Sequence, residues 1–353
     1  KNKDEAQAIV DYLTNPATQY EISKVTQKTT KRKPTAPFIT STMQRAASSK
    51  LGFGVQKTMQ VAQKLYEGIE IDGTPVGLIT YMRTDSKRIS PVAQQEASKF
   101  LHEKYGAEYA AKSQRHFKNQ EDAQDAHEAI RPTSVYRTPE SLKSVLTTEQ
   151  YRLYKLIWSR FVASEMKPAV YDTVRADIVQ NGVMFRTTGS KMKFAGFTQV
   201  YDNQQEKNVD LPDLEEGDKV QMTKSDNKQH FTQPPARYTE ASLVHALEEN
   251  GVGRPSTYAP TISTIQQRGY VEKGNKEGVK RAYDVLKLKG NRITESTKSE
   301  ITGNEKGKLL PTDVGIVVND FLKAYFPEIL DYNFTASVEK EFDEVAEGNK
   351  EWT

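Results

Sequence analysis

Two proline-containing segments mark abrupt changes in the sequence pattern, and they constrain the fold more than any other feature. The first, residues 33–37 (KPTAP), follows a Thr-rich segment in which apolar and polar residues alternate. A block with helical periodicity comes next and ends at Lys167-Pro168, after which alternation returns in AVYDTVRADIV. Because proline stiffens the backbone and interrupts helices, the pattern predicts a helical domain inserted into a β-rich one.

The fold class predicted from these changes is multidomain α+β. We expect a discontinuous β-rich arch from residues 1–33 and 168–232, an inserted mainly helical domain at 34–167, and a helical base domain at 233–353. In the base domain, two helices flank the turn GVGRPS and a basic hairpin-like stretch follows at 270–290, a winged-helix-like pattern. Near the C-terminus, a loop through Phe334-Thr335 is expected to precede the last helix.

Composition limits the class of protein. Hydrophobic residues make up 36% of the 353 positions, which favours several small cores and an open or arched molecule. The net charge of +3 requires that any nucleic-acid binding come from local patches. The absence of Cys excludes disulfides, thiolate zinc sites and Cys nucleophiles. Without a signal peptide or a long apolar run, a cytoplasmic protein is expected.

The segment GLITYMRTDS, residues 77–86, is the first candidate site. A hairpin signal precedes it, and its second strand is expected to end at Tyr81, with Arg83 leaving the same face two positions later. A tyrosinate can attack phosphorus, and a guanidinium binds phosphate oxygens, so the pair suits phosphoryl transfer. The alternative is a tyrosine half packed in a core with Arg83 on the surface, and this segment alone favours that alternative.

Two further motifs add cationic groups. In DAHEAIRPT, residues 125–133, His127 and Arg131 are expected four apart on one face of a helix that Pro132 ends, where they would contact a phosphate or a carboxylate. The alternative is a solvated helix end. In GRPSTY, residues 253–258, Ser256 is expected to cap a helix whose N-terminus, with Arg254 beside it, attracts phosphate. The alternative there is an ordinary capped helix.

Sequence motifs for several kinds of binding and catalysis are absent. GNEKGK at 303–308 is one residue short of a phosphate-binding loop, so no nucleotide cofactor is expected. The nucleophile elbow of serine hydrolases is absent. No Asp-x-Asp pair occurs, and the sequence therefore predicts no Mg²⁺ site in this chain.

Five motifs in one order, PFITSTMQRAASSKLGFG, GLITYMRTDS, DAHEAIRPT, RYTEASLVHALEENGVGRPSTYAPTISTIQQRGYV and LLPTDVGIVVNDFL, resemble those of bacterial type IA DNA topoisomerases. The resemblance implies a toroidal, ATP-independent enzyme that cleaves one DNA strand, holds the 5′ end on tyrosine, passes a strand and reseals, relaxing negative supercoils. It implies that Tyr81 is the nucleophile, that Arg83 is its phosphate partner and that His127 lies near the cleavage site. Arg254, Ser256 and Thr257 match the start of the family's single-strand-binding helix.

The departures from the family pattern are also informative. The Mg²⁺-binding toprim domain and the C-terminal zinc-ribbon or basic region have no counterpart, which suggests truncation at both ends. The resemblance implies Mg²⁺ in the full-length enzyme, with its site outside this chain. The expected partner is single-stranded or negatively supercoiled DNA, bound by a monomer in the bacterial nucleoid without membrane contact. We expect the chain alone to bind single-stranded DNA without relaxing supercoils. A non-catalytic winged-helix regulator and a tyrosine recombinase or type IB enzyme remain alternatives.

Overall fold

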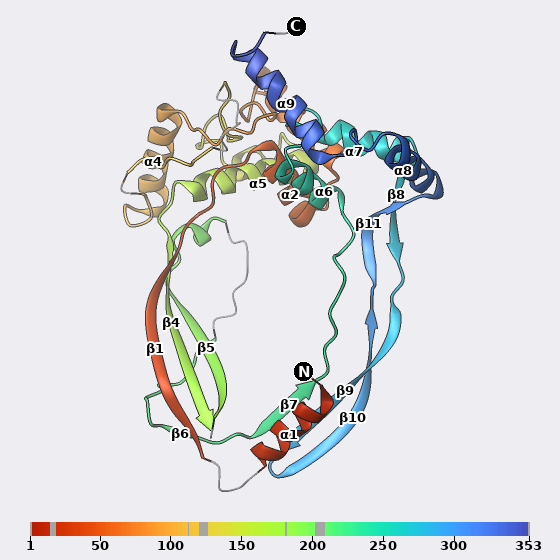
Figure 1. Ribbon diagram of the computed structural model, residues 1–353. Helices are drawn as coiled ribbons and strands as arrows, with labels where there is room; N and C mark the ends of the chain where they lie inside the picture. Colours follow the sequence, from red (N-terminus) through yellow and green to blue (C-terminus); the bar gives the residue numbers. More distant parts are fainter. Residues whose placement is uncertain are drawn as a thin grey trace.

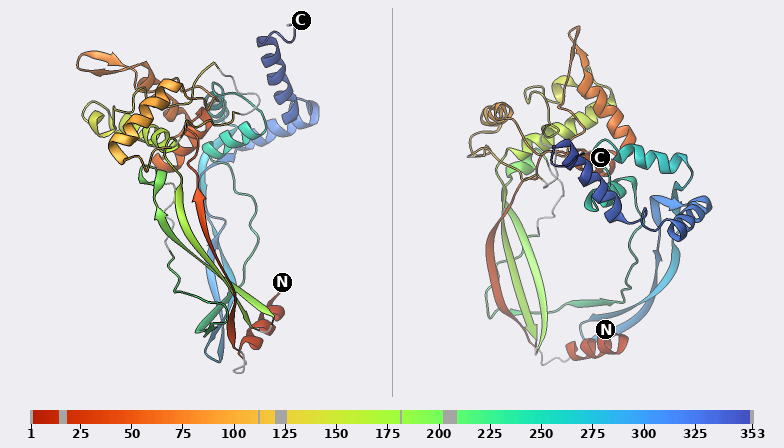
Figure 2. Two further views of the ribbon diagram at one scale, coloured as in Figure 1. Left: turned by 90° about the vertical axis from the view of Figure 1, so that its left-hand side faces the viewer. Right: turned by 45° about the horizontal axis from the view of Figure 1, so that its top comes forward.

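The elements of the chain are arranged as a ring (Figure 1). The computed structural model describes residues 2–14, 19–111, 113–119, 126–180, 182–201 and 209–351. Long strands form the two sides, most helices gather at the top, and helix α1 (Lys3–Leu13) lies at the base. The tilted view in Figure 2 shows the same open centre. Helices and antiparallel sheets in one chain agree with the predicted α+β class.

One side of the ring is an antiparallel sheet with the strand order β5-β4-β1-β6. Its strands are β1 (Tyr20–Arg32), β4 (Ala169–Gln180), β5 (Val183–Phe194) and β6 (Lys219–Val220). Arg32 lies opposite Ala169, so the two proline-containing crossings leave the end of this sheet side by side. The strands before and after the helical block thus form one sheet, as a discontinuous β-rich unit requires.

The block between the crossings has one large apolar core. Its elements are α2 (Thr40–Leu51), α3 (Val55–Glu67), β2 (Ile69–Ile71), β3 (Thr74–Val76), α4 (Pro91–Tyr105), the 3-10 turn η1 (Glu140–Leu142) and α5 (Thr148–Ser164). Helix α5 begins with a capping box between Thr147 and Gln150, and its Leu153, Tyr154 and Ile157 side chains are fully buried. The core therefore surrounds α5 and supports the segments that connect the other helices.

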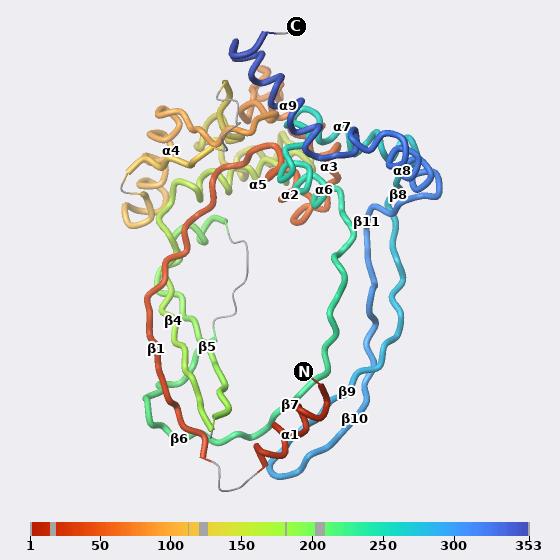
Figure 3. The backbone as a smooth tube through the Cα atoms, in the orientation of Figure 1, coloured from red at the N-terminus to blue at the C-terminus, as the bar shows by residue number. Residues whose placement is uncertain are grey.

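The other side of the ring is built from the second half of the chain. Figure 3 shows the path: a climb from β7 to α6, a passage across the top through α7, a descent through β8 and β9, and a return through β10 and β11 to α8. These elements are β7 (Lys224–Lys228), α6 (Glu240–Glu249), α7 (Tyr258–Gln267), β8 (Val271–Lys276), β9 (Val279–Lys289), β10 (Arg292–Thr302), β11 (Glu305–Pro311), α8 (Asp313–Tyr325) and α9 (Tyr332–Ala346), and the 3-10 turn η2 (Gly196–Gln199) precedes them.

The hairpin predicted within residues 270–290 is wrong. Strand β8 pairs with β11, whereas β9 pairs with β10 and with β7. The reversal occurs after β9, at Gly290, whose φ of 57° suits a two-residue hairpin turn. A wing formed by this stretch alone is therefore absent from the described residues, and β9 and β10 share a sheet with a strand that precedes residue 233.

The C-terminal helices lie on the outside of the ring (Figure 1). The loop expected through Phe334-Thr335 is wrong, because α9 already begins at Tyr332, where the Asp331 side chain accepts a hydrogen bond from the Asn333 N–H. In the described part of the chain, no residue of α8 or α9 is buried. Both helices are consequently held by few contacts with the rest of the molecule.

Candidate active site

Tyr81 lies on a bend that backbone hydrogen bonds hold in place. The strand before it ends at Val76, so the prediction that this strand reaches Tyr81 is wrong. After the strand, the Leu78 N–H donates to the Leu65 carbonyl at 2.7 Å and the Thr80 N–H donates to the Arg131 carbonyl at 2.9 Å. The Leu65 and Arg131 carbonyls thus accept from N–H groups that would otherwise have been available to continue the hairpin. Since Leu78 and Met82 are fully buried, the bend is fixed on both sides of Tyr81.

The ring of Tyr81 is half buried between two aromatic neighbours. It meets Tyr66 edge-on with centroids 5.3 Å apart, and it lies 4.7 Å from the His127 ring. The packed-tyrosine alternative is therefore correct for the ring. Within the described ranges, no residue hydrogen-bonds the Tyr81 hydroxyl. The packing orients the ring and leaves its oxygen unengaged, which is the arrangement that a nucleophile needs.

His127 reaches Tyr81 by a route different from the predicted helix. Residues 126–131 are not helical, and 121–125 lie outside the described residues. The Ile130 N–H donates to the Phe38 carbonyl and the Arg131 N–H to the Thr80 hydroxyl, so these groups are not available to a helix. The segment instead runs beside residues 77–80, and this places the exposed His127 against the tyrosine.

Arg131 is engaged with its own surroundings. Its Nε donates to Glu128 Oε2 at 2.8 Å, and its terminal nitrogens reach the Pro132 carbonyl and the Ser90 hydroxyl. Burial opposes the ionised form of Glu128, but the hydrogen bond and charge of Arg131 hold the pKa of that carboxyl below its usual value. In this structure Arg131 therefore ties the His127 segment to the start of α4.

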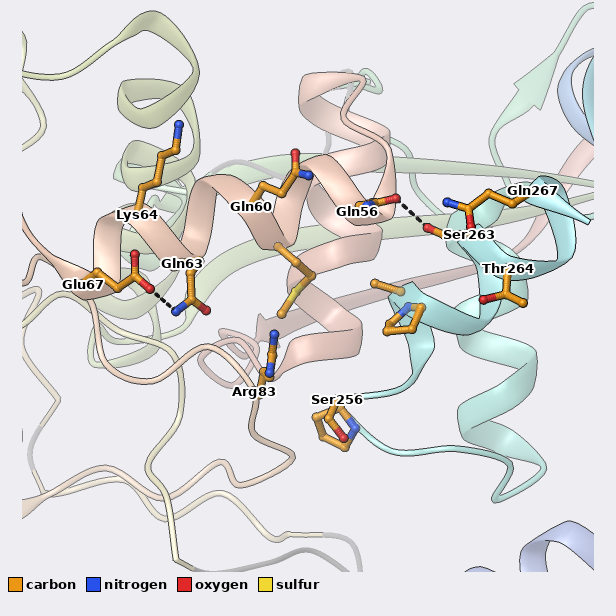
Figure 4. A pocket seen from close by; sticks show the side chains of 14 residues that line it. Gln56, Gln60, Gln63, Lys64, Glu67, Arg83, Ser256, Ser263, Thr264 and Gln267 are labelled. Atoms are coloured by element: carbon orange, nitrogen blue, oxygen red, sulfur yellow. Dashed lines mark hydrogen bonds between the residues drawn. The ribbon is translucent and has the colours of Figure 1, made fainter.

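Arg83 follows Tyr81 by two residues and lines a cavity of about 810 Å³ between α3 and α7. Figure 4 shows Arg83 and Ser256 at one end of the cavity, beneath the row formed by Gln56, Gln60 and Gln63 on α3. The described residues that line the cavity do not include Tyr81. Met82 and Arg83 lie in a bend, so the extended backbone on which the shared face of Tyr81 and Arg83 was predicted is not present there.

The turn before α7 differs from the predicted cap. The helix begins at Tyr258, and its N-cap position is Thr257, which makes no side-chain capping bond. The Thr257 hydroxyl instead accepts a hydrogen bond from the Arg254 N–H at 2.8 Å. Ser256 is consequently not the cap, and its side chain faces the cavity that Arg83 lines. Gly253, with φ of 83°, gives the backbone the left-handed turn that precedes Arg254.

The guanidinium of Arg254 is held by carboxylates of α9. Its Nη2 donates to Asp343 Oδ2 at 2.6 Å, its Nε lies 3.6 Å from Glu339 Oε2, and its Nη1 donates to the Gly253 carbonyl at 3.1 Å. Burial opposes the charged form of Arg254, but Asp343 and Glu339 outweigh it and raise the pKa of the guanidinium. This contact joins residues far apart in sequence, and the sequence patterns did not indicate it.

A second contact that the sequence did not indicate joins the helical block to α6 and α7. The Glu240 carboxylate accepts a hydrogen bond from the Val55 N–H at 2.9 Å and so caps α3. The Ser41 hydroxyl donates to Glu248, and the Ser263 hydroxyl donates to Gln56, each at 2.6 Å. Gly54 could have indicated this contact in the sequence. A glycine before α3 supplies no polar side chain to cap the helix, so the helix start needs a partner from elsewhere.

Comparison with known proteins places this chain in a family. The family described as DNA topoisomerase matches residues 1–304 of the chain. A structure of full-length topoisomerase I from Thermotoga maritima matches 99% of the chain with 35% sequence identity and a TM-score of 0.77. This chain belongs to the bacterial type IA DNA topoisomerase family. It covers 52% of the Thermotoga maritima chain, about half the length of that relative.

The family raises the question of a metal. Among the residues that the structure describes, no group of three or more His, Asp or Glu side chains could hold a metal ion. The side chains near Tyr81 therefore do not fit a Mg²⁺ site, and Glu128 is already bound to Arg131.

In the described ranges, no helix is both long enough and apolar enough to cross a lipid bilayer.

Proposed function

We propose that this chain carries the nucleophilic half of a type IA topoisomerase active site. Tyr81 attacks a phosphodiester of single-stranded DNA, forming a 5′-phosphotyrosine and a free 3′ hydroxyl. Another strand passes through the break, and the 3′ hydroxyl then attacks the phosphotyrosine to reseal it. The ester conserves the energy of the broken bond, so the cycle needs no ATP. The observation that carries the proposal is the Tyr81 ring, fixed between Tyr66 and His127 with its hydroxyl unengaged by described residues.

The residues around Tyr81 have distinct proposed roles. A phenol is a weak nucleophile until it loses its proton, so cationic surroundings that favour tyrosinate assist the attack. His127 lies against the ring, and its protonated form would add positive charge beside the phosphate. Arg83 is exposed and can bind phosphate oxygens, stabilising the charge that develops in the pentavalent transition state.

One part of the reaction has no candidate in the described residues near Tyr81. The departing 3′ oxygen needs a proton donor, and a guanidinium is a poor one because it stays charged. Glu128 is also unsuitable, since its bond to Arg131 holds it as the carboxylate. We therefore propose that this chain alone binds single-stranded DNA but does not relax supercoils. No step is assigned to Mg²⁺, because the described residues do not fit that ion.

The remaining features of the proposal follow from the family. We propose that the active protein is a cytoplasmic, nucleoid-associated monomer that acts on negatively supercoiled DNA. The division into residues 1–33 with 168–232, 34–167 and 233–353 stays a prediction. Two pairings bear on it: β1 with β4 agrees with the discontinuous first unit, and β7 with β9 crosses the boundary at 232. Supercoiled plasmid incubated with this chain and Mg²⁺ should keep its topoisomer distribution, and clear relaxation would contradict the proposal.

An adduct assay tests the nucleophile directly. An end-labelled oligonucleotide is incubated with Mg²⁺ and a complete enzyme that contains this chain, and the adduct is separated on a denaturing gel. We expect a 5′ adduct that Tyr81→Phe abolishes, because phenylalanine keeps the ring packing and removes only the attacking oxygen. Tyr66→Phe is the matched control and should retain the adduct. A 3′ adduct would instead indicate a tyrosine recombinase or type IB enzyme, and no adduct would indicate a non-catalytic regulator.

A further inference from the structure

Arg254 is a candidate phosphate ligand whose charge is already compensated. The side chain is 23% exposed and forms ion pairs with Asp343 and Glu339, which are themselves about one quarter exposed. Asp85 and Glu248 line the small cavity beside it. Among the described residues that line this cavity or pair with Arg254, a phosphate therefore meets more carboxylates than cations. Because like charges repel strongly when water is partly excluded, these carboxylates oppose phosphate binding as the structure stands.

Helix α9 presents two of its acidic groups from one face. Glu339 and Asp343 are four residues apart, so they project from the same side of the helix toward the turn that carries Arg254. The Ala336 Cβ on this face would lie 3.3 Å from a Cβ added at Gly251, so the helix rests closely on that turn. The contact brings the last helix of the chain against the start of α7 (Figure 1).

The same helix is weakly anchored elsewhere. In the described part of the chain no residue of α9 is buried, and Phe342 is 61% exposed. Burial of apolar surface supplies most of the energy that holds a helix in place, and partly exposed ion pairs contribute about 0–1 kcal/mol each. Moving α9 off the turn therefore costs little, and a phosphate can offer Arg254 an equivalent pair of oxygens.

We propose that α9 is an internal competitor for the DNA site: Glu339 and Asp343 occupy the Arg254 guanidinium in the DNA-free chain, and a phosphate of single-stranded DNA displaces them on binding. This inference rests on the proposed function, since it assumes that Arg254 contacts DNA. It adds two residues that set the affinity of the site, and it makes DNA binding and the position of α9 mutually dependent. An acidic helix in this place also disfavours occupation of the site by weakly bound anions.

The test measures binding of a fluorescein-labelled oligothymidylate by anisotropy. The double variant Glu339→Gln with Asp343→Asn should bind about three- to tenfold more tightly than the unmodified chain, because two competing charges are removed. Glu341→Gln is the matched control: it removes the same kind of charge from the same helix, where Glu341 pairs with Lys350, and should change affinity by less than about twofold. The gain should disappear when Arg254→Ala is added to the double variant.

A second measurement follows α9 itself. In the unmodified chain, adding the oligonucleotide should accelerate hydrogen exchange of the α9 amides, since the helix loses its contact with Arg254. Unchanged or weaker binding by the double variant would overturn the inference and would indicate that the carboxylates position Arg254. If the double variant binds the oligonucleotide and the unmodified chain does not, the inference is supported, because the two carboxylates then block the site completely. If neither protein binds the oligonucleotide, both the inference and the proposed single-strand binding fail.

Discussion

The surroundings of Tyr81 and of Arg254 differ in how they hold a functional side chain. Tyr81 follows fully buried residues on a bend that backbone hydrogen bonds attach to two neighbouring segments. Arg254 lies on a turn and is held by carboxylates from a helix with no buried residue in the described chain. Packing fixes a position to within the tolerance of the core, whereas ion pairs can be exchanged for other ions. The proposed nucleophile is thus preorganised, and the proposed DNA contact is adjustable.

The largest expected effect tests the role of packing. Met82→Ala removes a fully buried side chain next to Tyr81 and should lower the free energy of unfolding by about 2–5 kcal/mol, because the core cannot refill the cavity completely. Val92→Ala is the control in the same block, since Val92 is 76% exposed, and should change stability by no more than about 0.5 kcal/mol. Urea unfolding measures both. Equal stabilities would contradict the view that packing holds the Tyr81 bend.

A pH-dependent effect of similar size is expected from a buried acid in the same block. Glu165 is 5% exposed, and burial raises the pKa of its carboxyl to about 7 although the nearby charge of Arg115 lowers it. The folded chain then binds more protons than the unfolded chain between about pH 4.5 and 7, so stability falls as the pH rises through this window. Glu165→Gln should remove this dependence.

The size of this effect follows from the shift. Glu165→Gln should be more stable than the unmodified chain at pH 8 by up to about 3 kcal/mol, and the difference should shrink toward pH 4.5. Thermal unfolding across this range gives the measurement. Glu140→Gln, at an exposed glutamate of the same block, is the control and should leave the pH profile unchanged. A difference independent of pH would show that ionisation of Glu165 is not its source.

The smallest expected effect on stability concerns the turn that carries Arg254. Arg254→Ala should weaken single-strand binding by a similar factor for different sequences and reduce the dependence of affinity on salt by about one phosphate contact. Stability should change by less than about 1 kcal/mol, since the ion pairs it breaks are partly exposed. Anisotropy titrations at several salt concentrations provide the slope. An unchanged slope would contradict a phosphate role for Arg254.

Elements that depend on short segments of sequence were predicted well. Periodicity predicted a mainly helical block at 34–167, and helices α2, α3 and α4 lie within it, the last capped by Ser90. The paired prolines correctly marked where β1 and β4 leave their sheet. Three of the failures were the helix at 126–131, the hairpin after α7 and the cap at Ser256. In each case a distant partner or a nearby turn took the hydrogen bonds that local propensity would have used.

By itself, the sequence determined the types of most elements and the places where strand and helix patterns alternate at the prolines, and it proposed Tyr81 and Arg83 as candidate reactive residues. These follow from spacing along the chain, which is a local property. Only the tertiary structure decided that His127 packs on Tyr81, that Arg83 shares a cavity with Ser256, and that α9 holds Arg254. Such contacts depend on how segments far apart in sequence approach one another, because a side chain binds the partner that the fold brings within reach.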